Sequence, residues 1–382
     1  MPSWTDHAIW WHVYPLGFTG APKQAEQRVV HRLRRLEPWL DYAVELGCSG
    51  LMLGPIFAAE THGYDTVDHF RIDPRLGDEK DFDSLVEQAR ERGLRIVLDG
   101  VFNHVGRSFA GPREFLTDRA FEGHDRLVVL DHGRPAVQEY VAGVMDHWLG
   151  RGAAGWRLDA AYAVPADFWA GVLPQVRDRH PESWFVGEMI HGDYAGYVER
   201  SGLDSVTQYE LWKAIWSSLN DRNLFELAWA LDRHNGMLET FVPQTFAGNH
   251  DVSRLATRLE DPRHLGHALA ILFTVAGIPS VYYGDEEGLT GLKEEREGGD
   301  DAIRPAFPET PGERGPVFRL HQRLIGNRRR HPGVVRARTK VDHLTNRTAS
   351  LTTADVRLLL NLDDEAQVID GIEVPPHAWH LA

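Results

Sequence analysis

The sequence contains the run Gly155-Trp156-Arg157-Leu158-Asp159, which predicts a short buried strand that ends in a carboxylate. Side chains two residues apart on a strand point to the same side, so Arg157 can hold Asp159 in its ionised form. A buried pair of this kind also occurs as a purely structural ion pair. Three other stretches of the chain end in the same way, with an apolar run followed by Asp, Glu, His or Asn. The run is therefore one member of a set of strands.

Eight apolar runs alternate with longer segments in which apolar residues recur at helical spacing. The predicted strands comprise residues 9–14, 50–54, 95–101, 155–159, 184–188, 205–209, 241–248 and 278–283. The predicted helices comprise residues 30–46, 81–92, 137–149, 168–179, 211–219, 225–234, 263–275 and 317–330. Continuous apolar strands that alternate with helices indicate a parallel sheet, and eight such units predict a (β/α)₈ TIM barrel of the α/β class. An open, doubly wound sheet is the alternative.

Two long connections and the C-terminal part of the chain depart from this alternation. Residues 104–131 are rich in Gly and predict a short irregular insertion after the third strand, and residues 284–316 predict a second long loop over the same end. From about residue 335 the pattern is that of short strands between turns, at residues 349–353, 356–361, 367–370 and 378–381. The predicted division is a barrel of residues 1–103 and 135–334, an inserted subdomain of residues 104–134, and a small C-terminal antiparallel β domain of residues 335–382.

Composition excludes several classes of function. The 382 residues carry a formal net charge of −15, which disfavours binding to nucleic acid or to an anionic membrane surface. No apolar stretch reaches the roughly 20 residues of a membrane span, and the first ten residues do not resemble a signal peptide. The single cysteine, Cys48, excludes an internal disulfide and suits a reducing compartment, so we expect a cytoplasmic protein. The run Arg328-Arg329-Arg330 is interpreted as a solvated helix end.

Polar side chains follow four of the predicted strands. The strands of a parallel barrel all end on one face, and this face carries the active site, so these side chains should converge. They are Asp99, Asn103, His104, Arg157, Asp159, Glu188, Asn249, His250 and Asp251. Carboxylates crowded into one pocket repel and raise one another's pKa unless cations offset them. A cluster of this kind therefore predicts a site with a chemical task.

Cleavage of a glycosidic bond needs two carboxyl groups that flank the bond, one ionised and one protonated. Asp159, next to Arg157, suits attack on the anomeric carbon. Glu188 follows the next strand, and negative charge near it would favour the protonated form that donates to the leaving oxygen. Asp251 can stabilise the positive charge of the transition state, while His104 and His250 can donate hydrogen bonds to sugar hydroxyls. The sequence contains no Gly-rich phosphate loop, no HExxH zinc motif and no catalytic Cys–His setting.

These residues resemble the α-amylase family, family thirteen of the retaining glycoside hydrolases. The stretches that carry the resemblance are Asp99-Gly100-Val101-Phe102-Asn103-His104, Gly155-Trp156-Arg157-Leu158-Asp159, Val186-Gly187-Glu188, Phe246-Ala247-Gly248-Asn249-His250-Asp251, His62-Gly63-Tyr64-Asp65 with Ile72-Asp73-Pro74-Arg75-Leu76-Gly77, and Gly277-Ile278-Pro279-Ser280-Val281-Tyr282-Tyr283-Gly284-Asp285-Glu286. They occur in the family's order over residues 8–330. The resemblance implies Asp159 as the nucleophile, Glu188 as the general acid/base and Asp251 as the stabiliser of the transition state.

The resemblance also implies a set of residues around the cleaved sugar. Arg157 would be the partner of the nucleophile. His104 and His250 would contact the sugar by hydrogen bonds, and Tyr64 would stack beneath its ring. Those that grip a non-reducing end in oligosaccharide-directed members would be Asp65, Asp300 and Arg304, for which a surface ion pair is the alternative. Those that support the site as scaffold would be Asp99, Asn103 and Asn249.

The chain departs from the family after the nucleophile. Starch-degrading members often place Lys-His there, serving an acceptor subsite and a calcium ion, whereas this chain has Ala160-Ala161-Tyr162. The insertion is short, and no Asp-rich calcium loop follows the first strand. We therefore expect no required metal and no cofactor.

The resulting hypothesis is a retaining α-glycosidase that hydrolyses α-1,4-glucosidic bonds of malto-oligosaccharides or related α-glucans through a covalent glucosyl–Asp159 intermediate. One alternative is a transglycosylase or isomerase of the same family that transfers glucosyl groups, as a trehalose synthase does. Another is a non-catalytic carbohydrate-binding barrel. The expected partner is an oligosaccharide or α-glucan, and the sequence leaves the oligomeric state open.

Overall fold

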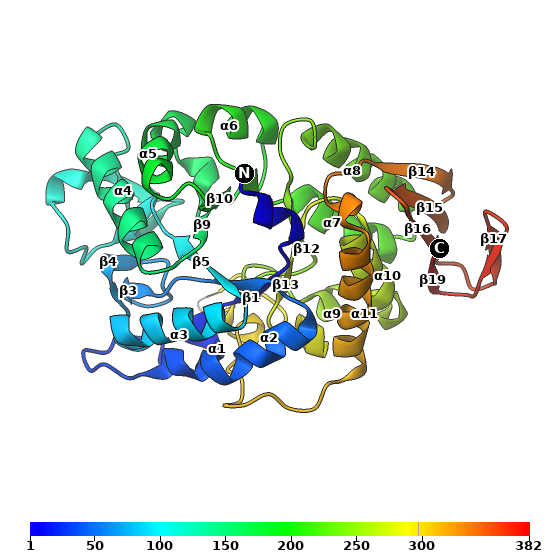
Figure 1. Ribbon diagram of the computed structural model, residues 1–382, viewed down its shortest axis with the longest axis horizontal. Helices are drawn as coiled ribbons and strands as arrows, with labels where there is room; N and C mark the ends of the chain where they lie inside the picture. The colour runs from blue at the N-terminus through cyan, green and yellow to red at the C-terminus, as the bar shows by residue number, and fades with distance from the viewer. Residues whose placement is uncertain (297) are drawn as a thin grey trace.

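The centre of the molecule is a ring of eight parallel strands in a computed structural model that describes residues 1–296 and 298–382 (Figure 1). The strands are β1 (Trp10–Val13), β2 (Gly50–Leu53), β5 (Arg95–Gly100), β9 (Gly155–Leu158), β10 (Trp184–Gly187), β11 (Ser205–Val206), β12 (Gln244–Phe246) and β13 (Ile278–Tyr282). Each strand pairs with the next barrel strand along the chain, and β13 pairs with β1. Between β11 and β12 the contact is a single bridge between Thr207 and Gln244. The predicted barrel and its eight strands are confirmed, although β11 and β12 are shorter than predicted.

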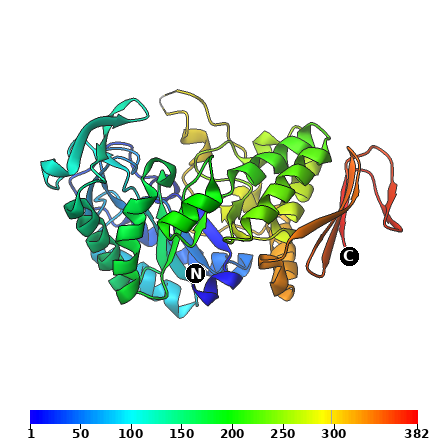
Figure 2. The same ribbon diagram turned by 90° about the horizontal axis from the view of Figure 1, so that it is seen from above.

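Helices cover the outside of the ring (Figures 1 and 2). Their bounds are α1 (Pro15–Phe18), α2 (Leu40–Leu46), α3 (Glu79–Glu91), α4 (Pro135–Gly150), α5 (Ala166–Arg179), α6 (Tyr194–Ser201), α7 (Tyr209–Asn220), α8 (Leu224–Met237), α9 (Leu255–Arg258), α10 (Leu265–Thr274) and α11 (Pro316–Arg330). Their apolar faces pack on the outward side chains of the strands, as Tyr42 of α2 does against Trp11 of β1. Among the described residues, none of these helices has the length and apolar character that crossing a membrane requires.

The inside of the barrel changes from apolar to polar along the strands. At the amino-terminal end, Trp10 of β1 stacks on Trp184 of β10, with ring centroids 5.6 Å apart. Around them lies a separate buried cluster: Ala8, Met52, Val97, Val186, Val242, Ile278 and Val335. Inward-facing residues recur at every second position, so the next inward position after Trp184 and Val186 is Glu188. The apolar plug therefore leaves the carboxyl ends of the strands to polar side chains.

Gly155 is fixed by the close approach of two strands at this plug. A Cβ atom at Gly155 would lie 2.1 Å from the carbonyl oxygen of Trp184, which belongs to the backbone of the paired strand β10. We expect Gly155→Ala to lower the free energy of unfolding by about 2–3 kcal/mol, because the backbone must move apart to admit the methyl group. Urea denaturation measures this loss. In the matched control Gly143→Ala, on α4, the Cβ meets no atom within 4 Å, so stability should be kept or raised; equal stabilities of the two variants would contradict the prediction.

The insertion after β5 is not irregular, as the sequence predicted, but a three-stranded antiparallel sheet. Its strands are β6 (His104–Gly106), β7 (Leu116–Phe121) and β8 (His124–Leu130), in the order β6-β8-β7. The turn between β7 and β8 contains Glu122 and Gly123, both with positive φ (49° and 77°). The prediction failed because β7 has no buried residue, so it lacks the apolar alternation by which a half-buried strand is recognised.

Two segments extend beyond the same side of the barrel (Figure 2). One is the inserted sheet. The other is the long connection after β13, which runs to α11 and contains the 3₁₀ turns Asp285–Glu287 and Asp301–Ile303. A small antiparallel sheet, β3 (Phe57–Ala59) with β4 (Thr66–Ile72), adds to the loop after β2. These segments follow the carboxyl ends of barrel strands and therefore surround the polar end of the ring.

The C-terminal part forms a small β structure at one end of the molecule (Figure 1). Its sheet has the order β14-β15-β16-β19, beside the hairpin β17–β18. The strands are β14 (Thr339–Leu344), β15 (Thr348–Thr353), β16 (Val356–Asn361), β17 (Gln367–Ile369), β18 (Ile372–Val374) and β19 (Ala378–Leu381). The four predicted strands are confirmed, and β14 and β18 are additional. The sheet packs on α8 and α10 of the barrel.

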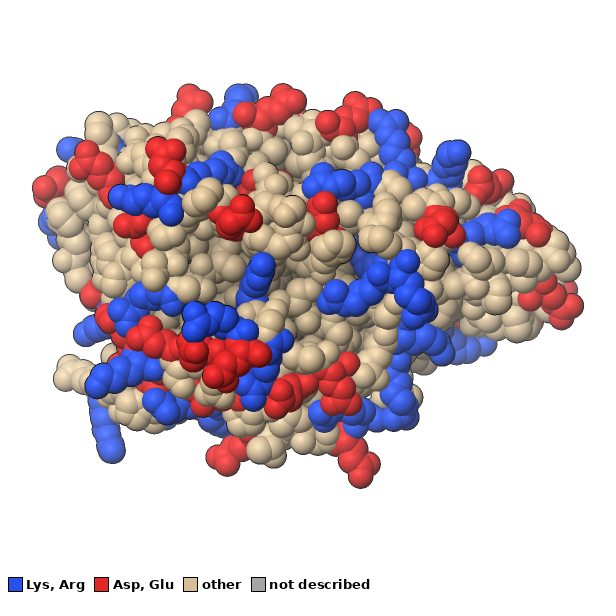
Figure 3. Space-filling model, viewed as in Figure 1, with Lys and Arg blue, Asp and Glu red and all other residues tan. Residues whose placement is uncertain are grey.

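The Arg run at the end of α11 is only partly the solvated helix end that the sequence predicted. Figure 3 shows Lys and Arg side chains gathered over this helix, and Arg329 and Arg330 are exposed. Arg328 is buried, and its guanidinium donates hydrogen bonds to the carbonyl oxygens of Phe273 and Val275 at 3.1 and 2.7 Å. It therefore satisfies carbonyl groups at the end of α10, which would otherwise be left without donors.

Candidate active site

Four of the predicted residues meet where β5, β9 and β10 end. Asp99 lies in β5, Arg157 in β9, and Asp159 and Glu188 directly follow β9 and β10. The register of β9 and β10 pairs Leu158 with Gly187, so Asp159 and Glu188, which follow these two residues, are neighbours. All four side chains are buried. The strand-end argument from the sequence therefore places them in one pocket.

Arg157 is the cation that joins the three carboxylates. Its Nη1 lies 2.7 Å from both oxygens of Asp99 and 3.2 Å from Oδ1 of Asp159, and its Nη2 lies 2.8 Å from Oε1 of Glu188. The predicted contact with Asp159 is present, but the shorter contacts go to the other two. Burial and the charge of Glu188 raise the pKa of Asp159 well above its ordinary value, and Arg157 only opposes this shift. Arg157 thus favours the ionised form of Asp159, as expected, but its effect is smaller than those of burial and of the charge of Glu188.

Glu188 has further donors around it. The backbone N–H of Ala160 donates to its Oε2 at 2.9 Å, and the hydroxyl of Tyr209 lies 3.4 Å from its Oε1. The side-chain amide of Asn249 donates to that hydroxyl at 2.8 Å. Asn249 thus supports the site through Tyr209, a residue that was not among the predicted site residues. Tyr209 is the last residue of the sixth predicted strand, so the strand-end rule would have included it.

Asp251 lies between His250 and Arg304. His250 Nε2 is 2.8 Å from its Oδ2, and Arg304 Nη2 is 2.9 Å from its Oδ1. Burial by itself would raise the pKa of Asp251, but His250, Arg304 and Arg157 together hold it below its ordinary value. Asp251 is therefore ionised at neutral pH, and its charge can act on a neighbouring cationic centre.

Tyr64 connects the loop after β2 to both sides of the site. Its hydroxyl donates to Oδ2 of Asp99 at 3.0 Å and also contacts Nε2 of His250. The Tyr64 and His250 rings are parallel within 3°, with centroids 5.3 Å apart. Tyr64 is thus held between Asp99 and His250.

His104 is buried beside the inserted sheet. Its Nε2 lies 3.0 Å from the carbonyl oxygen of Tyr64, its Nδ1 lies 3.1 Å from the amide of Asn103, and its ring stacks on Phe121 at 4.4 Å. Burial lowers the pKa of His104 to about 4, so the ring is neutral at neutral pH. Both ring nitrogens are already engaged, which makes Asn103 part of the scaffold that orients His104.

The residues predicted at the non-reducing end lie at the edge of the same pocket. Arg304 Nη2 is 3.0 Å from Oδ2 of Asp300, and its guanidinium carbon lies 4.7 Å from the ring centroid of Tyr14. The Arg304 side chain is 10% exposed and that of Asp300 is 36% exposed, so the pair lies partly at the surface. Asp65 is buried, accepts a hydrogen bond from Thr61 at 2.5 Å, and has its Oδ1 without a partner among the described residues. Tyr14, like Tyr209, is a strand-end aromatic residue that the sequence did not assign to the site.

Beyond Asp159, a tyrosine takes the place of the Lys-His of starch-degrading enzymes. The hydroxyl of Tyr162 donates to Glu122 Oε1 at 2.8 Å, so the turn of the inserted sheet is tied to the loop after β9. The Tyr162 ring lies 5.9 Å from that of His191, which follows β10. Ala160 adopts a left-handed conformation (φ 46°), which turns the chain away from Asp159. This side of the pocket therefore presents a tethered phenol.

The comparisons with known proteins agree with this geometry. A family model described as the catalytic domain of α-amylase matches residues 32–126 and 119–310. A cyclomaltodextrinase of Geobacillus thermopakistaniensis is 27% identical, over 96% of this chain and 71% of that protein. An intracellular maltogenic amylase of Bacillus subtilis is 29% identical, over 76% of this chain and 57% of that protein. Among solved structures, the cyclic α-maltosyl-(1→6)-maltose hydrolase of Arthrobacter globiformis shares the fold with a TM-score of 0.86 at 24% identity, covering 100% of this chain and 99% of that one.

Proposed function

The chain belongs to the α-amylase family of glycoside hydrolases, and from this premise we propose that it is a retaining α-glycosidase that hydrolyses α-1,4-glucosidic bonds of malto-oligosaccharides. The observation that carries the proposal is the arrangement around one guanidinium. Arg157 joins Asp159 and Glu188 at the ends of neighbouring strands, and Asp251 faces them from the end of β12. Two carboxyl groups on either side of one bond are the chemical requirement of this reaction.

In the proposed first step, an Asp159 oxygen attacks the anomeric carbon. The bond from that carbon to the leaving oxygen breaks, and Glu188 gives its proton to this oxygen. In the second step Glu188 takes a proton from water, the water oxygen attacks the same carbon, and the Asp159 carboxylate is released. Two displacements at one carbon keep the α configuration. Burial and the charge of Glu188 raise the pKa of Asp159. In the productive state of this mechanism the proton is on Glu188 and Asp159 is ionised.

We propose that the surrounding residues stabilise the positively charged transition state and bind the sugar on which its charge develops. Asp251, held ionised by His250 and Arg304, would stabilise the charge that develops on the sugar ring. Tyr64 would stack beneath this ring. His250, whose Nδ1 has no partner among the described residues, would orient its hydroxyls. His104 would do so by exchanging its hydrogen bond to the Tyr64 carbonyl oxygen for one to the sugar. The proposed grip on a non-reducing end consists of Asp65, Asp300 and Arg304, and the proposed scaffold of Asp99, Asn103 and Asn249.

We further propose a cytoplasmic enzyme with an α-glucan or oligosaccharide as its partner. The buried thiol of Cys48 supports a reducing compartment, and one relative bears the name intracellular maltogenic amylase. The proposed domain division is a catalytic barrel of residues 1–103 and 135–334, an inserted subdomain of residues 104–134, and a C-terminal β domain of residues 335–382.

A second candidate function is glucosyl transfer at the same site. It is favoured by the acceptor side of the pocket, where Tyr162, tied to Glu122, offers an aromatic face on which an acceptor sugar could stack instead of water entering. A non-catalytic barrel is disfavoured, because all three candidate carboxylates are present and lie at one face of the barrel.

Analysis of the products formed from a panel of glucosides tests the proposal and separates hydrolysis from glucosyl transfer. We expect maltotriose, maltose or cyclodextrin to be cleaved faster than isomaltose or trehalose, because the proposed specificity is for α-1,4 bonds, which the latter two sugars lack. Proton NMR of the first turnovers should show the α anomer of the product. A β anomer would overturn the retaining mechanism, and inactivity on every substrate would overturn the assignment. If millimolar maltose diverts most of the glucosyl group from water to longer sugars, the enzyme is a transferase.

A further inference from the structure

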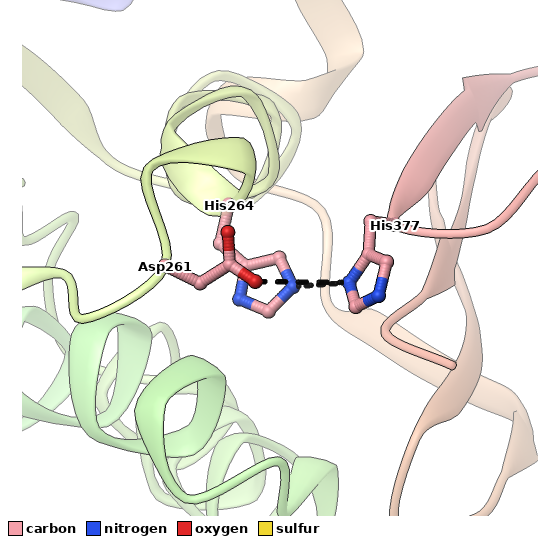
Figure 4. A group of neighbouring side chains, drawn as sticks. All are labelled: Asp261, His264 and His377. Carbon is pink, nitrogen blue, oxygen red and sulfur yellow. Dashed lines mark hydrogen bonds and ion pairs between the residues drawn. The ribbon is translucent and has the colours of Figure 1, made fainter. Parts of the chain in front are cut away.

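Two histidines and an aspartate meet where the barrel contacts the C-terminal β structure. Asp261 and His264 belong to the 3₁₀ turn before α10, while His377 lies in the turn before β19 (Figure 4). His264 and His377 are buried, with exposures of 1% and 9%, and Asp261 is partly buried. None of the three belongs to a loop that follows the carboxyl ends of β5, β9 or β10. The glycosidase site makes no use of them.

The ligand atoms of these three side chains point toward one space. His264 Nε2 and His377 Nδ1 are 3.0 Å apart, and Asp261 Oδ2 lies 4.0 Å from the latter. All three atoms lie within 4.8 Å of one another. A zinc ion takes His nitrogen at about 2.0–2.1 Å and carboxylate oxygen at about 2.0–2.2 Å, so its ligand atoms lie roughly 3.3 Å apart in a tetrahedral site. The three side chains therefore need only small adjustments to share one cation.

The neighbours of the cluster leave the ligand atoms available. His377 Nε2 lies 2.8 Å from Asp364 Oδ1, so this nitrogen carries the proton and Nδ1 presents a lone pair to His264. A carboxylate behind a histidine is the usual support of a metal-bound imidazole. Arg263 donates to both oxygens of Asp261, with Nη2 2.6 Å from Oδ2 and Nε 2.9 Å from Oδ1. A carboxylate has about four lone-pair sites, so Oδ2 can also bind a cation.

The protein offers an informative contrast in a second group of potential ligands, His31, Asp78 and Asp81. There, Asp78 and Asp81 form the capping box at the start of α3, and Arg34 and His31 both contact Asp81. Helix capping and ion pairing account for that group completely. Capping and ion pairing also involve Asp261, which accepts from the backbone N–H of Arg263 and pairs with its guanidinium. They do not account for two buried imidazoles from distant parts of the chain whose nitrogens face each other.

We propose that Asp261, His264 and His377 form a structural site for a divalent transition metal, best suited to zinc, with water in the fourth position. Two imidazoles and one carboxylate suit Zn²⁺ better than Mg²⁺ or Ca²⁺, because the latter two ions favour oxygen ligands. The cation replaces the single proton between the two ring nitrogens. Because His377 is 113 residues from His264 in the chain, the metal links the C-terminal β structure to the barrel. The site takes no part in the cleavage of sugars.

Metal titration of the full-length, tag-free, chelator-treated protein tests this proposal. We expect isothermal titration calorimetry to show one Zn²⁺ bound per chain, and bound Zn²⁺ to raise Tm, because a ligand that binds only the native state stabilises it. Co²⁺ should give the visible absorption of a tetrahedral ion. No saturable binding of either metal would overturn the proposal, and this result would leave the glycosidase assignment untouched.

Three variants locate the site. His377→Asn keeps an amide near the Nδ1 position and tolerates the positive φ of 48° at this residue, and His264→Gln keeps an amide near the Nε2 position. Each should lower zinc affinity at least tenfold while circular dichroism remains that of the wild type. The control is His380→Asn, an exposed histidine on β19, which should bind zinc as the wild type does. Undiminished zinc affinity in both His377→Asn and His264→Gln would place the metal elsewhere and refute the site.

Discussion

Replacing Asp159 with Asn is expected to lower kcat/KM for maltotriose by at least about a thousandfold while the protein still binds the sugar. The amide has the shape of the carboxyl group but cannot form the glycosyl ester. Arg157 retains Asp99 and Glu188 as partners at 2.7 and 2.8 Å, so its position should not change. Steady-state kinetics and calorimetric binding of maltotriose measure the two effects separately. Turnover within tenfold of the wild type would refute the nucleophile.

Stability separates this role from that of a structural ion pair. Burial and Glu188 raise the pKa of Asp159, so the folded state binds a proton more tightly than the unfolded state. The native protein then loses stability as pH rises through the folded pKa, and the neutral Asn removes this loss. We therefore expect Asp159→Asn to raise Tm at neutral pH. A structural ion pair predicts the opposite sign, a lower Tm.

The matched control is a buried aspartate at the other end of the barrel. Asp204 precedes β11 and accepts from Arg177 at 3.0 Å and from the backbone N–H of Phe185 at 3.0 Å. Asp204→Asn should lower Tm because it weakens a real structural pair, yet kcat/KM should stay within about threefold of the wild type. The two variants should therefore change Tm in opposite directions, and only Asp159→Asn should lower turnover.

The barrel was predictable because each of its strands is buried on both faces. Such strands are read as uninterrupted apolar runs, as in Trp184–Gly187. The strands of the insertion gave no such signal. In β7 (Leu116–Phe121) every residue is partly or fully exposed, so the composition resembles that of a loop. The sequence therefore reports burial well and reports hydrogen-bonded pairing between exposed segments poorly.

The charged residues of the site were predictable for a related reason. A carboxylate or histidine directly after an apolar run is costly unless it has partners, so its position is informative. Aromatic residues at the same positions are ambiguous, because Tyr14 and Tyr209 look like core residues until their contacts with Arg304 and Glu188 are known. The pair His264 and His377 had no signal of any kind, since only the packing of the C-terminal sheet on α10 brings them together.

Glu188→Gln should remove most activity on maltotriose and spare an activated substrate. A glucosyl group leaving from a sugar oxygen needs a proton, and loss of the acid should cost about a thousandfold in kcat/KM. Fluoride leaves without full protonation, so the first step with α-maltosyl fluoride should stay within about tenfold of the wild type. Rapid-quench kinetics should show a burst of fluoride followed by slow turnover, because water then lacks its base. Azide should restore turnover, since it attacks without giving up a proton.

The same variant tests the electrostatic coupling between the two carboxyl groups. The charge of Glu188 raises the pKa of Asp159, so its removal should lower that pKa and move the acid limb of kcat/KM for the fluoride toward lower pH. The control is Glu210→Gln, which breaks only the ion pair with Arg233 on the outside of α7 and should change neither substrate nor pH profile. Equal losses on both substrates, with the acid limb unmoved, would mean that Glu188 is not the proton donor. Selective loss on maltotriose together with the shifted limb requires a group that carries the proton and also lies within electrostatic reach of the nucleophile. Glu188 meets the second condition, because Arg157 pairs through Nη2 with Glu188 and through Nη1 with Asp159 and Asp99.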